Sequence, residues 1–490
     1  MGRQSRIYND NGLEVRYNYD ALDRISHIRY GNGVETAYAY DVDGNISSME
    51  TKAGENILLS FAYEYDGNGN RTAKTGMQMT AGSCALDISY DYDIRGQLLE
   101  ECRNGTSTQY TYDKAGNRIK KTDAQGEIRY FYNAKNQLLR EEAEDAEKQF
   151  TYDRQGGIIK ETNPSGIRRF AYDSRHRQTK VETKDGNVQE NRYDVENLRF
   201  ELLENGKRTR FVYHDGELLH EEGGKDNRQT GYHLGAGIEA FTRAEETFYY
   251  QQDEQLSTAF ITGRNGAVHN SYQYDAFGNE LETAGQLQNR IRYTGQQYDK
   301  IIGQYYLRAR YYNPVLGRFM QEDTYQGDGL NLYAYCKNNP VTYYDPSGYM
   351  TDNCSGSAVE NPDNMQAENA DVAWNNGWRT KDGKFASPRG SQRAGEQAEK
   401  EVWDAIAQKK GWKVERGRIY TKDSTGQVRV YDGMATDPKG RQIGLEVKSG
   451  SARKTKAQRE IDKRVSKSNP AKGIGRSKGI EIGHVITIRR

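Results

Sequence analysis

The chain has 490 residues, more than one hydrophobic core ordinarily supports, so we expect at least two domains. Only 34% of the residues are hydrophobic, whereas 37 are tyrosine, 51 are glycine and 8 are proline, a composition that favours strands and turns over packed helices. The sequence contains no apolar run long enough to cross a membrane. The four cysteines are scattered without a CxxC pair, which argues against both a disulfide-rich scaffold and a zinc module.

The zero net charge hides an uneven distribution along the chain. Residues 1–350 carry 42 basic and 52 acidic side chains, whereas residues 351–490 carry 28 basic and 18 acidic ones. The basic excess lies after residue 375, because residues 351–375 contain five acids and no base. A polyanion such as a nucleic acid is the natural partner of this basic stretch. The first ten residues, MGRQSRIYND, contain no apolar signal-peptide core, so we expect export to depend on a separate delivery apparatus.

A Tyr-Asp repeat runs through the first 349 residues. The pair recurs in segments such as AYDVDGNI, TYDKAGNR and QYDAFGNE, in most units every 20 or 21 residues. This period is long enough for two strands and two turns. Glycine and asparagine after the pair permit the positive φ of a hairpin turn, and the flanking residues alternate as they do in a strand. The pattern predicts a long antiparallel sheet over residues 1–349.

These repeats resemble the RHS/YD-repeat family over roughly residues 10–349. The most specific part of the resemblance covers residues 305–348, YYLRARYYNPVLGRFMQEDTYQGDGLNLYAYCKNNPVTYYDPSG, which is similar to the conserved end of the RHS core. The resemblance implies a mainly β shell, in which one long sheet spirals around a hollow interior. Because about 340 residues of repeat are few for a complete shell, upstream RHS segments are expected to complete it.

The same resemblance implies that the chain cleaves itself just after the DPSG motif, near residue 349. The residues that it assigns to this reaction are Arg310, Asp323 and Asp345. Two carboxylates that share a proton can activate water, so this pair would act as an aspartyl-type autoprotease. The alternative is that Asp345 only begins a turn and that Asp323 only caps one. The sequence departs from the family at Thr324, where many members have proline.

Residues 350–375 are polar and acidic without periodicity, which predicts a linker. Residues 376–490 then have the pattern of a separate α+β domain. A helix is expected in SQRAGEQAEKEVWDAIAQKKGW, where apolar residues recur at helical spacing. Glu399 falls on the apolar stripe of this helix, where a carboxylate needs a cation as a partner, whereas Glu401 falls on the solvent side.

Two further carboxylates lie on a predicted hairpin whose turn is DPKG, residues 437–440. With the turn there, residues pair across the strands when their numbers add up to 877 or 878, which sets Asp432 opposite Glu446. Lys448 shares the face of Glu446. Opposed carboxylates repel each other unless a cation lies between them, so the sequence predicts a Mg²⁺ site here. The alternative is that Glu446 and Lys448 form an ordinary surface ion pair.

This arrangement resembles the PD-(D/E)xK nucleases, which have a restriction-endonuclease-like fold. The resemblance implies that Asp432, Glu446 and Glu399 hold Mg²⁺ or Mn²⁺, and that Lys448 orients water or stabilises charge in the transition state. Gln458 matches a glutamine that is common in related toxin nucleases. The basic character of residues 376–490 suits a nucleic acid substrate.

These features together predict a contact-dependent or secreted antibacterial toxin. Its C-terminal domain, released by self-cleavage, would hydrolyse nucleic acid in the cytoplasm of the target cell, and DNA is the favoured substrate. A cognate immunity protein is expected, and it should be acidic to complement the basic domain. Two alternatives stay open, namely an RNase toxin of the same fold and a YD-repeat protein for surface adhesion or carbohydrate binding with an inert tail.

Overall fold

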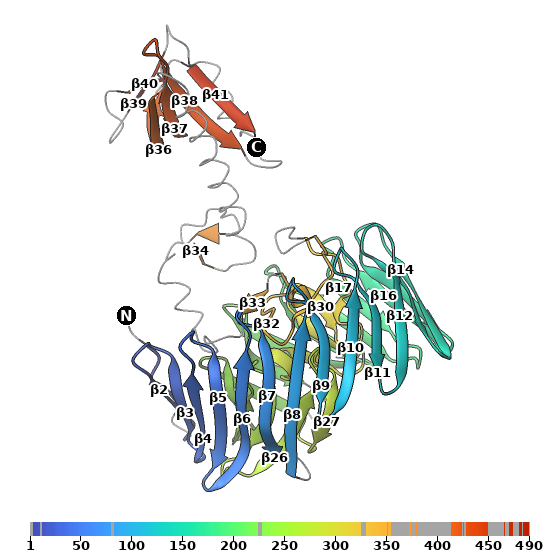
Figure 1. Ribbon diagram of the computed structural model, residues 1–490. Coiled ribbons are helices and arrows are strands. Elements are labelled where there is room, and N and C mark those ends of the chain that lie inside the picture. Colours follow the sequence, from blue (N-terminus) through green and yellow to red (C-terminus); the bar gives the residue numbers. More distant parts are fainter. Residues whose placement is uncertain are drawn as a thin grey trace. The chain divides into compact units, whose positions relative to one another are not determined.

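Strands make up almost all of the regular structure in the described part of the chain, as the computed structural model in Figure 1 shows. The structure describes residues 3–353 apart from 10–11, 80–82, 224–227, 325–329 and 350. Further along, it describes residues 372–373, 379–380, 413–423, 425, 428–448, 465, 470–473, 480–482 and 484–489. The chain divides into two units, Met1–Lys381 and Asp382–Arg490.

The first unit is built on a 27-stranded antiparallel sheet, in which each strand pairs with the next one along the chain. This confirms the antiparallel sheet that the Tyr-Asp repeat predicts. The strands are β1 (Arg6–Tyr8), β2 (Glu14–Tyr19), β3 (Ile25–Tyr30), β4 (Val34–Tyr40), β5 (Ile46–Ala53), β6 (Asn56–Tyr65), β7 (Arg71–Met79), β8 (Ser83–Tyr92), β9 (Leu98–Arg103), β10 (Thr106–Tyr112), β11 (Arg118–Asp123), β12 (Gly126–Tyr132), β13 (Leu138–Ala143), β14 (Ala146–Tyr152), β15 (Ile158–Asn163), β16 (Gly166–Tyr172), β17 (Gln178–Glu182), β18 (Val188–Tyr193), β19 (Arg199–Glu204), β20 (Lys207–His214), β21 (Glu217–Gly223), β22 (Arg228–Leu234), β23 (Ile238–Arg243), β24 (Glu246–Gln252), β25 (Thr258–Thr262), β26 (Val268–Tyr274) and β27 (Glu280–Ala284).

The aspartate of each Tyr-Asp pair organises the turn that follows it. In the turn after β10, Asp113 Oδ1 accepts hydrogen bonds from the backbone N–H groups of Ala115 and Asn117, both at 2.9 Å. Gly116 has a φ of 78°, a conformation that glycine adopts without strain. Asn133 makes the two equivalent contacts in the turn after β12. The turn therefore needs a short side chain with an acceptor oxygen at this position, and either Asp or Asn supplies it.

The tyrosines of the repeat link each unit to the one before it. Tyr132 donates a hydrogen bond from its hydroxyl to the backbone carbonyl of Arg118 at 2.8 Å, and Tyr172 makes the same bond to Ile158 at 2.9 Å. The rings pack on the concave side of the sheet, where a tyrosine supplies apolar area and a polar tip together. This explains how a chain with so few aliphatic residues builds a core.

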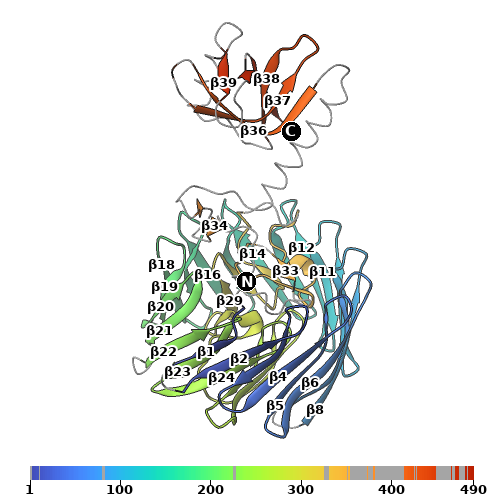
Figure 2. The same cartoon turned by 90° about the vertical axis from the view of Figure 1, so that its left-hand side faces the viewer.

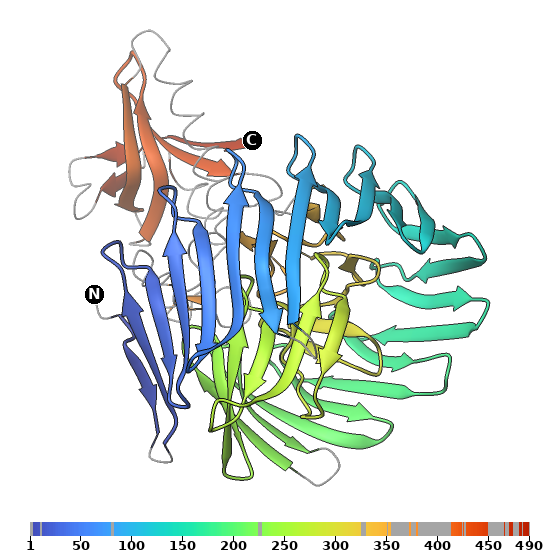
Figure 3. The ribbon, with the colours of Figure 1, turned by 60° about the horizontal axis from the view of Figure 1, so that its bottom comes forward.

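The sheet curls until its first strands meet strands that follow them by more than 170 residues (Figures 2 and 3). Buried residues of β2–β6 share one hydrophobic cluster with buried residues of β23–β25. We call this contact the seam. It joins β2–β9 to the turns that follow β22, β24 and β26, and its polar members are Tyr17, Tyr30, Tyr63, Arg71, Lys74, Glu101, Glu239, Asp253, Glu254 and Asp275.

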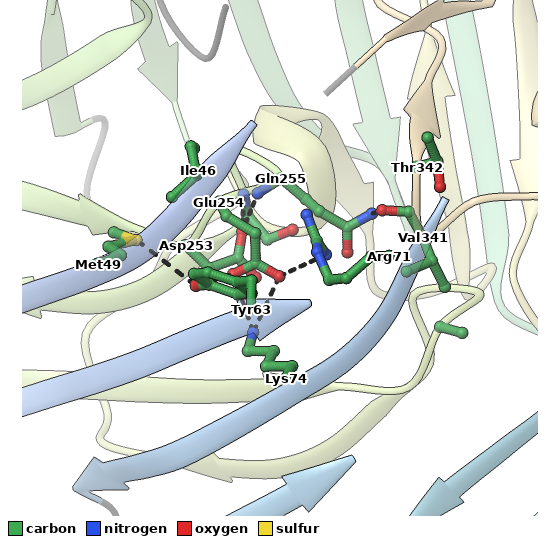
Figure 4. A network of polar contacts seen from close by, with 12 residues as sticks. Ile46, Met49, Tyr63, Arg71, Lys74, Asp253, Glu254, Gln255, Val341 and Thr342 are labelled. Atoms are coloured by element: carbon green, nitrogen blue, oxygen red, sulfur yellow. Dashed lines mark hydrogen bonds and ion pairs between the residues drawn. The ribbon is translucent and has the colours of Figure 1, made fainter. Parts of the chain in front are cut away.

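Glu254 is the centre of the polar network in the seam (Figure 4). Its side chain is 1% exposed and contacts Arg71 at 2.7 Å and Lys74 at 3.0 Å, while Tyr63 donates a hydrogen bond to it at 2.8 Å. Although burial alone would raise its pKa, Lys74 and Arg71 hold the pKa of Glu254 at about 2. A buried carboxylate with two cations and a hydroxyl as partners fixes the turn after β24 against β6 and β7.

The segment that follows β27 packs against the concave face of the sheet, which Figure 3 shows as the yellow and orange strands inside the curve. It contains a four-stranded sheet, two short 3₁₀ helices and a two-stranded pair. The four-stranded sheet consists of β28 (Gln297–Asp299), β29 (Gln304–Leu307), β30 (Arg310–Asn313) and β31 (Arg318–Phe319), and the 3₁₀ helices are η1 (Tyr293–Gly295) and η2 (Cys336–Asn338). The two-stranded pair consists of β32 (Tyr343–Tyr344) and β33 (Asp352–Asn353). Further along the chain, β34 (Val372–Ala373) pairs with β35 (Arg379–Thr380). The concave side is thus lined by residues of the chain's own segment 301–320.

The described part of the second unit is a six-stranded sheet. Its strands are β36 (Lys413–Lys422), β37 (Val428–Thr436), β38 (Gln442–Lys448), β39 (Ala471–Gly473), β40 (Glu481–Ile482) and β41 (His484–Arg489), in the order β40-β39-β36-β37-β38-β41. The pairing of β38 with β41 is parallel. The predicted helix around Glu399 lies outside the described residues. Within the described residues, no helix has the length and apolar character needed to span a membrane.

Candidate active sites

The junction between the repeat and the C-terminal part of the chain is held by the hairpin of β29 and β30. Arg308 and Ala309 form its two-residue turn, and Arg310 is the first residue of β30. Tyr305, Tyr306, Tyr311 and Tyr312 on the two strands are almost completely buried. This tyrosine packing fixes the hairpin and so fixes the direction of the arginine side chains that it carries.

Arg310 brings the two predicted aspartates together. Its Nη2 lies 2.8 Å from Asp323 Oδ2 and 3.7 Å from Asp345 Oδ2, and all three residues are buried. The guanidinium also donates to the carbonyl of Leu332 at 3.0 Å and stacks on the ring of Phe319 at 3.5 Å. Arg310 thus holds two buried carboxylates around one guanidinium.

Asp345 also shapes the DPSG loop through its other oxygen. Its Oδ1 accepts hydrogen bonds from the backbone N–H groups of Ser347 at 3.0 Å and Gly348 at 2.8 Å. Gly348 has a φ of 75°, and a Cβ atom there would lie 2.4 Å from the carbonyl oxygen of Leu307. Glycine is therefore required where the loop presses against the hairpin.

The peptide bond after Gly348 faces this cluster. Arg310 Nε donates a hydrogen bond to the Gly348 carbonyl oxygen. Burial and the charge of Asp323 raise the pKa of Tyr349, while Arg310 and a hydrogen bond with Thr324 act in the opposite direction. The Gly348 carbonyl and the carboxylates of Asp323 and Asp345 thus share Arg310 as a common partner.

In the second unit, the DPKG turn forms where the sequence predicts it. The N–H of Gly440 donates to the carbonyl of Asp437 at 2.9 Å, and Gly440 has a φ of 78°. Asp437 Oδ1 accepts from the N–H groups of Lys439 and Arg441, both at 2.9 Å. The hydrogen bonds of Arg441, and to a smaller extent that of Lys439, lower the pKa of Asp437.

The register of this hairpin places the two predicted carboxylate positions side by side. Gly433 on β37 pairs with Leu445 on β38, so the next positions along the two strands are Asp432 and Glu446. This is the predicted register. Lys448 lies at the end of β38. The side chains of these three residues are outside the described part of the structure, as are Glu399 and Gln458 altogether.

A family model described as Teneurin YD-shell matches residues 75–341, more than half of the chain. The chain belongs to the Teneurin YD-shell family. The Tyr-Asp repeats and the curled sheet are thus the YD shell of this family, and the predicted RHS/YD-repeat shell is confirmed.

Relatives of this YD-shell chain include two bacterial proteins. It is 36% identical over 171 residues to the tRNA3(Ser)-specific nuclease WapA of Bacillus spizizenii, a match that covers 32% of this chain and 7% of WapA. It is 26% identical over 310 residues to the double-stranded DNA deaminase toxin A of Burkholderia cenocepacia, covering 60% of this chain and 17% of the toxin. The crystal structure of TcdB2-TccC3-Cdc42 superposes with a TM-score of 0.37 at 17% identity, covering 69% of this chain and 22% of that chain. The chain thus spans a small fraction of the length of the curated relatives that it matches.

The YD-shell chain also has a junction residue that the sequence reasoning missed. Arg308 donates hydrogen bonds to the carbonyl of Pro346, inside the DPSG loop, and to the carbonyl of Gly216 at 2.8 Å. The signal that could have identified it is the RAR triplet at residues 308–310, because two arginines on either side of a tight turn are unusual without acceptors for both.

Proposed function

We propose that this YD-shell chain is a toxin that cleaves itself next to Tyr349 and whose C-terminal residues hydrolyse nucleic acid, with DNA as the favoured substrate. The observation that carries the proposal is that Arg310 binds the carbonyl of Gly348 through Nε and the carboxylates of Asp323 and Asp345 through Nη2. A shell that cuts the chain at its own end has a use only if the residues beyond the cut act separately. The names of the two relatives, a tRNA nuclease and a DNA deaminase toxin, support a toxin that acts on nucleic acid.

The cleavage itself follows from the chemistry of the three residues. One aspartate, as the carboxylate, takes a proton from water while the water oxygen attacks the carbonyl carbon. Arg310 stabilises the negative charge that develops on the carbonyl oxygen. The other aspartate, protonated at the start, gives its proton to the leaving nitrogen as the C–N bond breaks. The products are a free carboxylate on the shell and a free amine on the C-terminal part.

Self-cleavage is tested by intact mass spectrometry of the full chain that carries Glu446→Ala. This substitution should inactivate the proposed nuclease and so protect the producing cell. We expect two fragments that meet at or next to Tyr349, and a single uncut chain when Asp345→Asn is added. Asparagine keeps the Oδ1 acceptor of the turn, as Asn133 does in its own turn, so folding should be retained. Asp41→Asn, in the turn after β4, is the matched control and should cleave normally. A folded Glu446→Ala chain that stays in one piece would contradict the proposal.

The hairpin register supports the nuclease part of the proposal. Asp432 and Glu446 occupy neighbouring strand positions, from which their carboxylates would hold a divalent cation, and Glu399 would complete the set of ligands. Mg²⁺ or Mn²⁺ held by these residues would supply the activation of water and the neutralisation of phosphate charge. Lys448 would orient water or stabilise charge on the phosphate, and Gln458 would contact the substrate. The basic excess after residue 375 would bind the phosphate backbone, and an acidic immunity protein would protect the producer.

The nuclease is tested by incubating the full chain with plasmid DNA, genomic DNA and total RNA, with and without Mg²⁺. We expect Mg²⁺-dependent loss of DNA, and a fall of about 100-fold or more for Asp432→Ala, Glu446→Ala and Lys448→Ala, because each removes a metal or transition-state contact. Glu401→Ala, on the solvent side of the predicted helix, is the control and should retain full activity. Loss of RNA alone would assign an RNase. Unchanged DNA and RNA would favour a binding protein with an inert tail.

A further inference from the structure

The turn of the β29–β30 hairpin holds three consecutive carbonyl groups of the DPSG loop. Arg308 donates from Nη1 to Pro346, the N–H of Ala309 donates to the Ser347 carbonyl at 3.2 Å, and Arg310 donates from Nε to Gly348. The three donors are consecutive in the sequence, and so are the three acceptors. The backbone that leads to the peptide bond after Gly348 is therefore fixed at each residue.

The backbone of Arg308 indicates that this position is kept for its side chain. Arg308 has a φ of 60°, in the left-handed region, where any residue other than glycine is strained by roughly 1 kcal/mol or more. Glycine or asparagine is the usual choice for such a turn. A residue in an unfavourable conformation persists when its side chain makes contacts that outweigh the strain, and such residues gather at functional sites.

Arg308 joins the loop to the wall of the shell. Its Nε donates to the carbonyl of Gly216 at 2.8 Å, and its Nη2 forms an ion pair with Glu217. Gly216 has a φ of 81° and lies in the tight turn that joins the paired strands β20 and β21. The guanidinium therefore contacts the wall hairpin on one side and the carbonyl of Pro346 on the other. The contact of Arg308 with the DPSG loop is thus fixed only when this part of the wall has formed.

We propose that Arg308 is a positioning residue for self-cleavage, which makes the reaction depend on the assembled β20–β21 hairpin. The inference rests on the self-cleavage proposed above. Arg308 touches neither of the two aspartates in the contacts described, and its effect passes through Pro346 to the position of the Gly348 carbonyl. Displacements of about 1 Å at a reacting group cost on the order of 100-fold in rate. Loss of the Arg308 contacts should consequently slow the cleavage and also allow cleavage at neighbouring peptide bonds.

The test measures the rate and the position of the cut in the full Glu446→Ala chain and in three added variants, Arg308→Ala, Arg308→Lys and Glu217→Gln. Arg308→Ala should cleave at least tenfold more slowly and give several fragment masses instead of one pair, and methylguanidine in the buffer should restore part of the rate and the single pair. Arg308→Lys keeps the charge but not the fork of donors, so it should be intermediate. Glu217→Gln weakens only the wall anchor and should cleave a fewfold more slowly.

The matched controls are Arg129→Ala and Glu127→Gln, an ion pair of 2.7 Å on an exposed part of the wall, which should leave the cut unchanged. If Arg308→Ala does not fold, Glu217→Gln carries the test alone. The inference is overturned if Asp345→Asn stops the reaction while the Arg308 and Glu217 variants cleave at the parent rate and at one bond. A folded parent that does not cleave would overturn the proposed function, and the inference with it.

Discussion

The two oxygens of Asp345 have different partners, so the turn that it begins is compatible with the role proposed for it in self-cleavage. Oδ1 accepts from the N–H groups of Ser347 and Gly348 and so begins a turn, while Oδ2 faces the guanidinium of Arg310. An aspartate that shapes the loop also holds a carboxylate oxygen near the peptide bond after Gly348. Holding a reactive group through the turn that it organises reduces the freedom that catalysis would otherwise have to remove.

At Asp432 and Glu446 the residue scale gives a prediction about stability. If the side chains face each other as the register implies, their repulsion destabilises the metal-free hairpin. We expect Asp432→Ala and Glu446→Ala to leave the melting temperature in EDTA unchanged or slightly higher. The corresponding gain in free energy of unfolding is at most roughly 0.2–1 kcal/mol. Mg²⁺ should raise the melting temperature of the parent and not that of the variants. If both variants melt well below the parent in EDTA and Mg²⁺ has no effect on the parent, the hairpin is held by an ion pair with Lys448.

The sequence predicts this hairpin because the residues that determine it lie next to one another in the chain. Asp437 and Gly440 have the side-chain oxygen and the positive φ that the turn needs, and the turn alone sets the register. Arg310, Asp323 and Asp345 come instead from the resemblance to the end of the RHS core, and the structure brings them together. Arg308 was missed because its acceptor at Gly216 lies 92 residues away, on another element.

At the scale of elements, the YD turn explains why the repeat tolerates so much variation elsewhere. Its requirements are an acceptor oxygen on the Asp or Asn, and a residue able to adopt a positive φ three positions later. The tyrosine before it adds a bond to the preceding repeat, which a spacing of about 20 residues makes possible. The period and the turn residues can be read from the sequence, whereas the partner of the tyrosine hydroxyl appears only once the strands are packed.

The turn after β10 provides a direct measurement of this requirement. Asp113→Ala removes the acceptor of two backbone N–H groups, Ala115 and Asn117, and should lower the free energy of unfolding by about 1–2 kcal/mol. Asp113→Asn should cost less, because it keeps the acceptor of both backbone N–H groups, as Asn133 does in the next YD turn, and loses only the hydrogen bond from Asn117 Nδ2 to Oδ2. Urea denaturation checks both expectations, because a shift of the denaturation midpoint at an unchanged m-value reports the change in free energy of unfolding. Equal losses for the two variants would mean that the charge of the aspartate, and not its acceptor oxygen, stabilises the turn.

At the scale of the whole first unit, the seam is the feature that the sequence does not reveal. Glu254 and Arg71 are separated by 183 residues, and Glu239 and Tyr17 by 222. The local pattern does not reveal these partners, even though the turn at Asp253 has Gln252 and Leu256 in place of the usual tyrosine and glycine. Their meeting depends on how far the sheet curls per repeat, a small angle that accumulates over more than twenty strands.

Several acids of the seam have pKa values above the usual range. Burial, and then the charge of Glu254, raises the pKa of Asp253 to about 6, and burial followed by the charge of Glu101 raises that of Asp275 to about 6. Burial also raises the pKa of Glu239, which accepts hydrogen bonds from Tyr17 at 2.7 Å and from Tyr30 at 3.5 Å. These groups bind protons more tightly in the folded protein than in the unfolded chain.

The first unit should therefore be more stable at pH 5 than at pH 7. From pH 5 to pH 7 the folded state loses protons that the unfolded chain, with aspartate pKa values near 3.8, has already lost, so the free energy of unfolding falls as pH rises through about 6. Glu254 acts in the opposite direction at lower pH, because its pKa is lowered from 4.5 to about 2 and the stability from its ion pairs is lost as the pH falls through that range. Since Asp253 and Asp275 keep some exposure to solvent, each should contribute about 1–2 kcal/mol.

Asp253→Asn separates this effect from other sources of pH dependence. Asparagine keeps the oxygen that accepts the N–H groups of Gln255 at 2.9 Å and Ser257 at 2.8 Å, as Asn133 does in its own YD turn, but it carries no charge to be buried beside Glu254. Thermal melts from pH 4 to pH 8 should show the variant more stable than the parent at pH 7.5, by a margin that shrinks as the pH falls toward 4. If the difference between the variant and the parent stays constant across this range, then the titration of Asp253 does not contribute to the pH dependence of the shell.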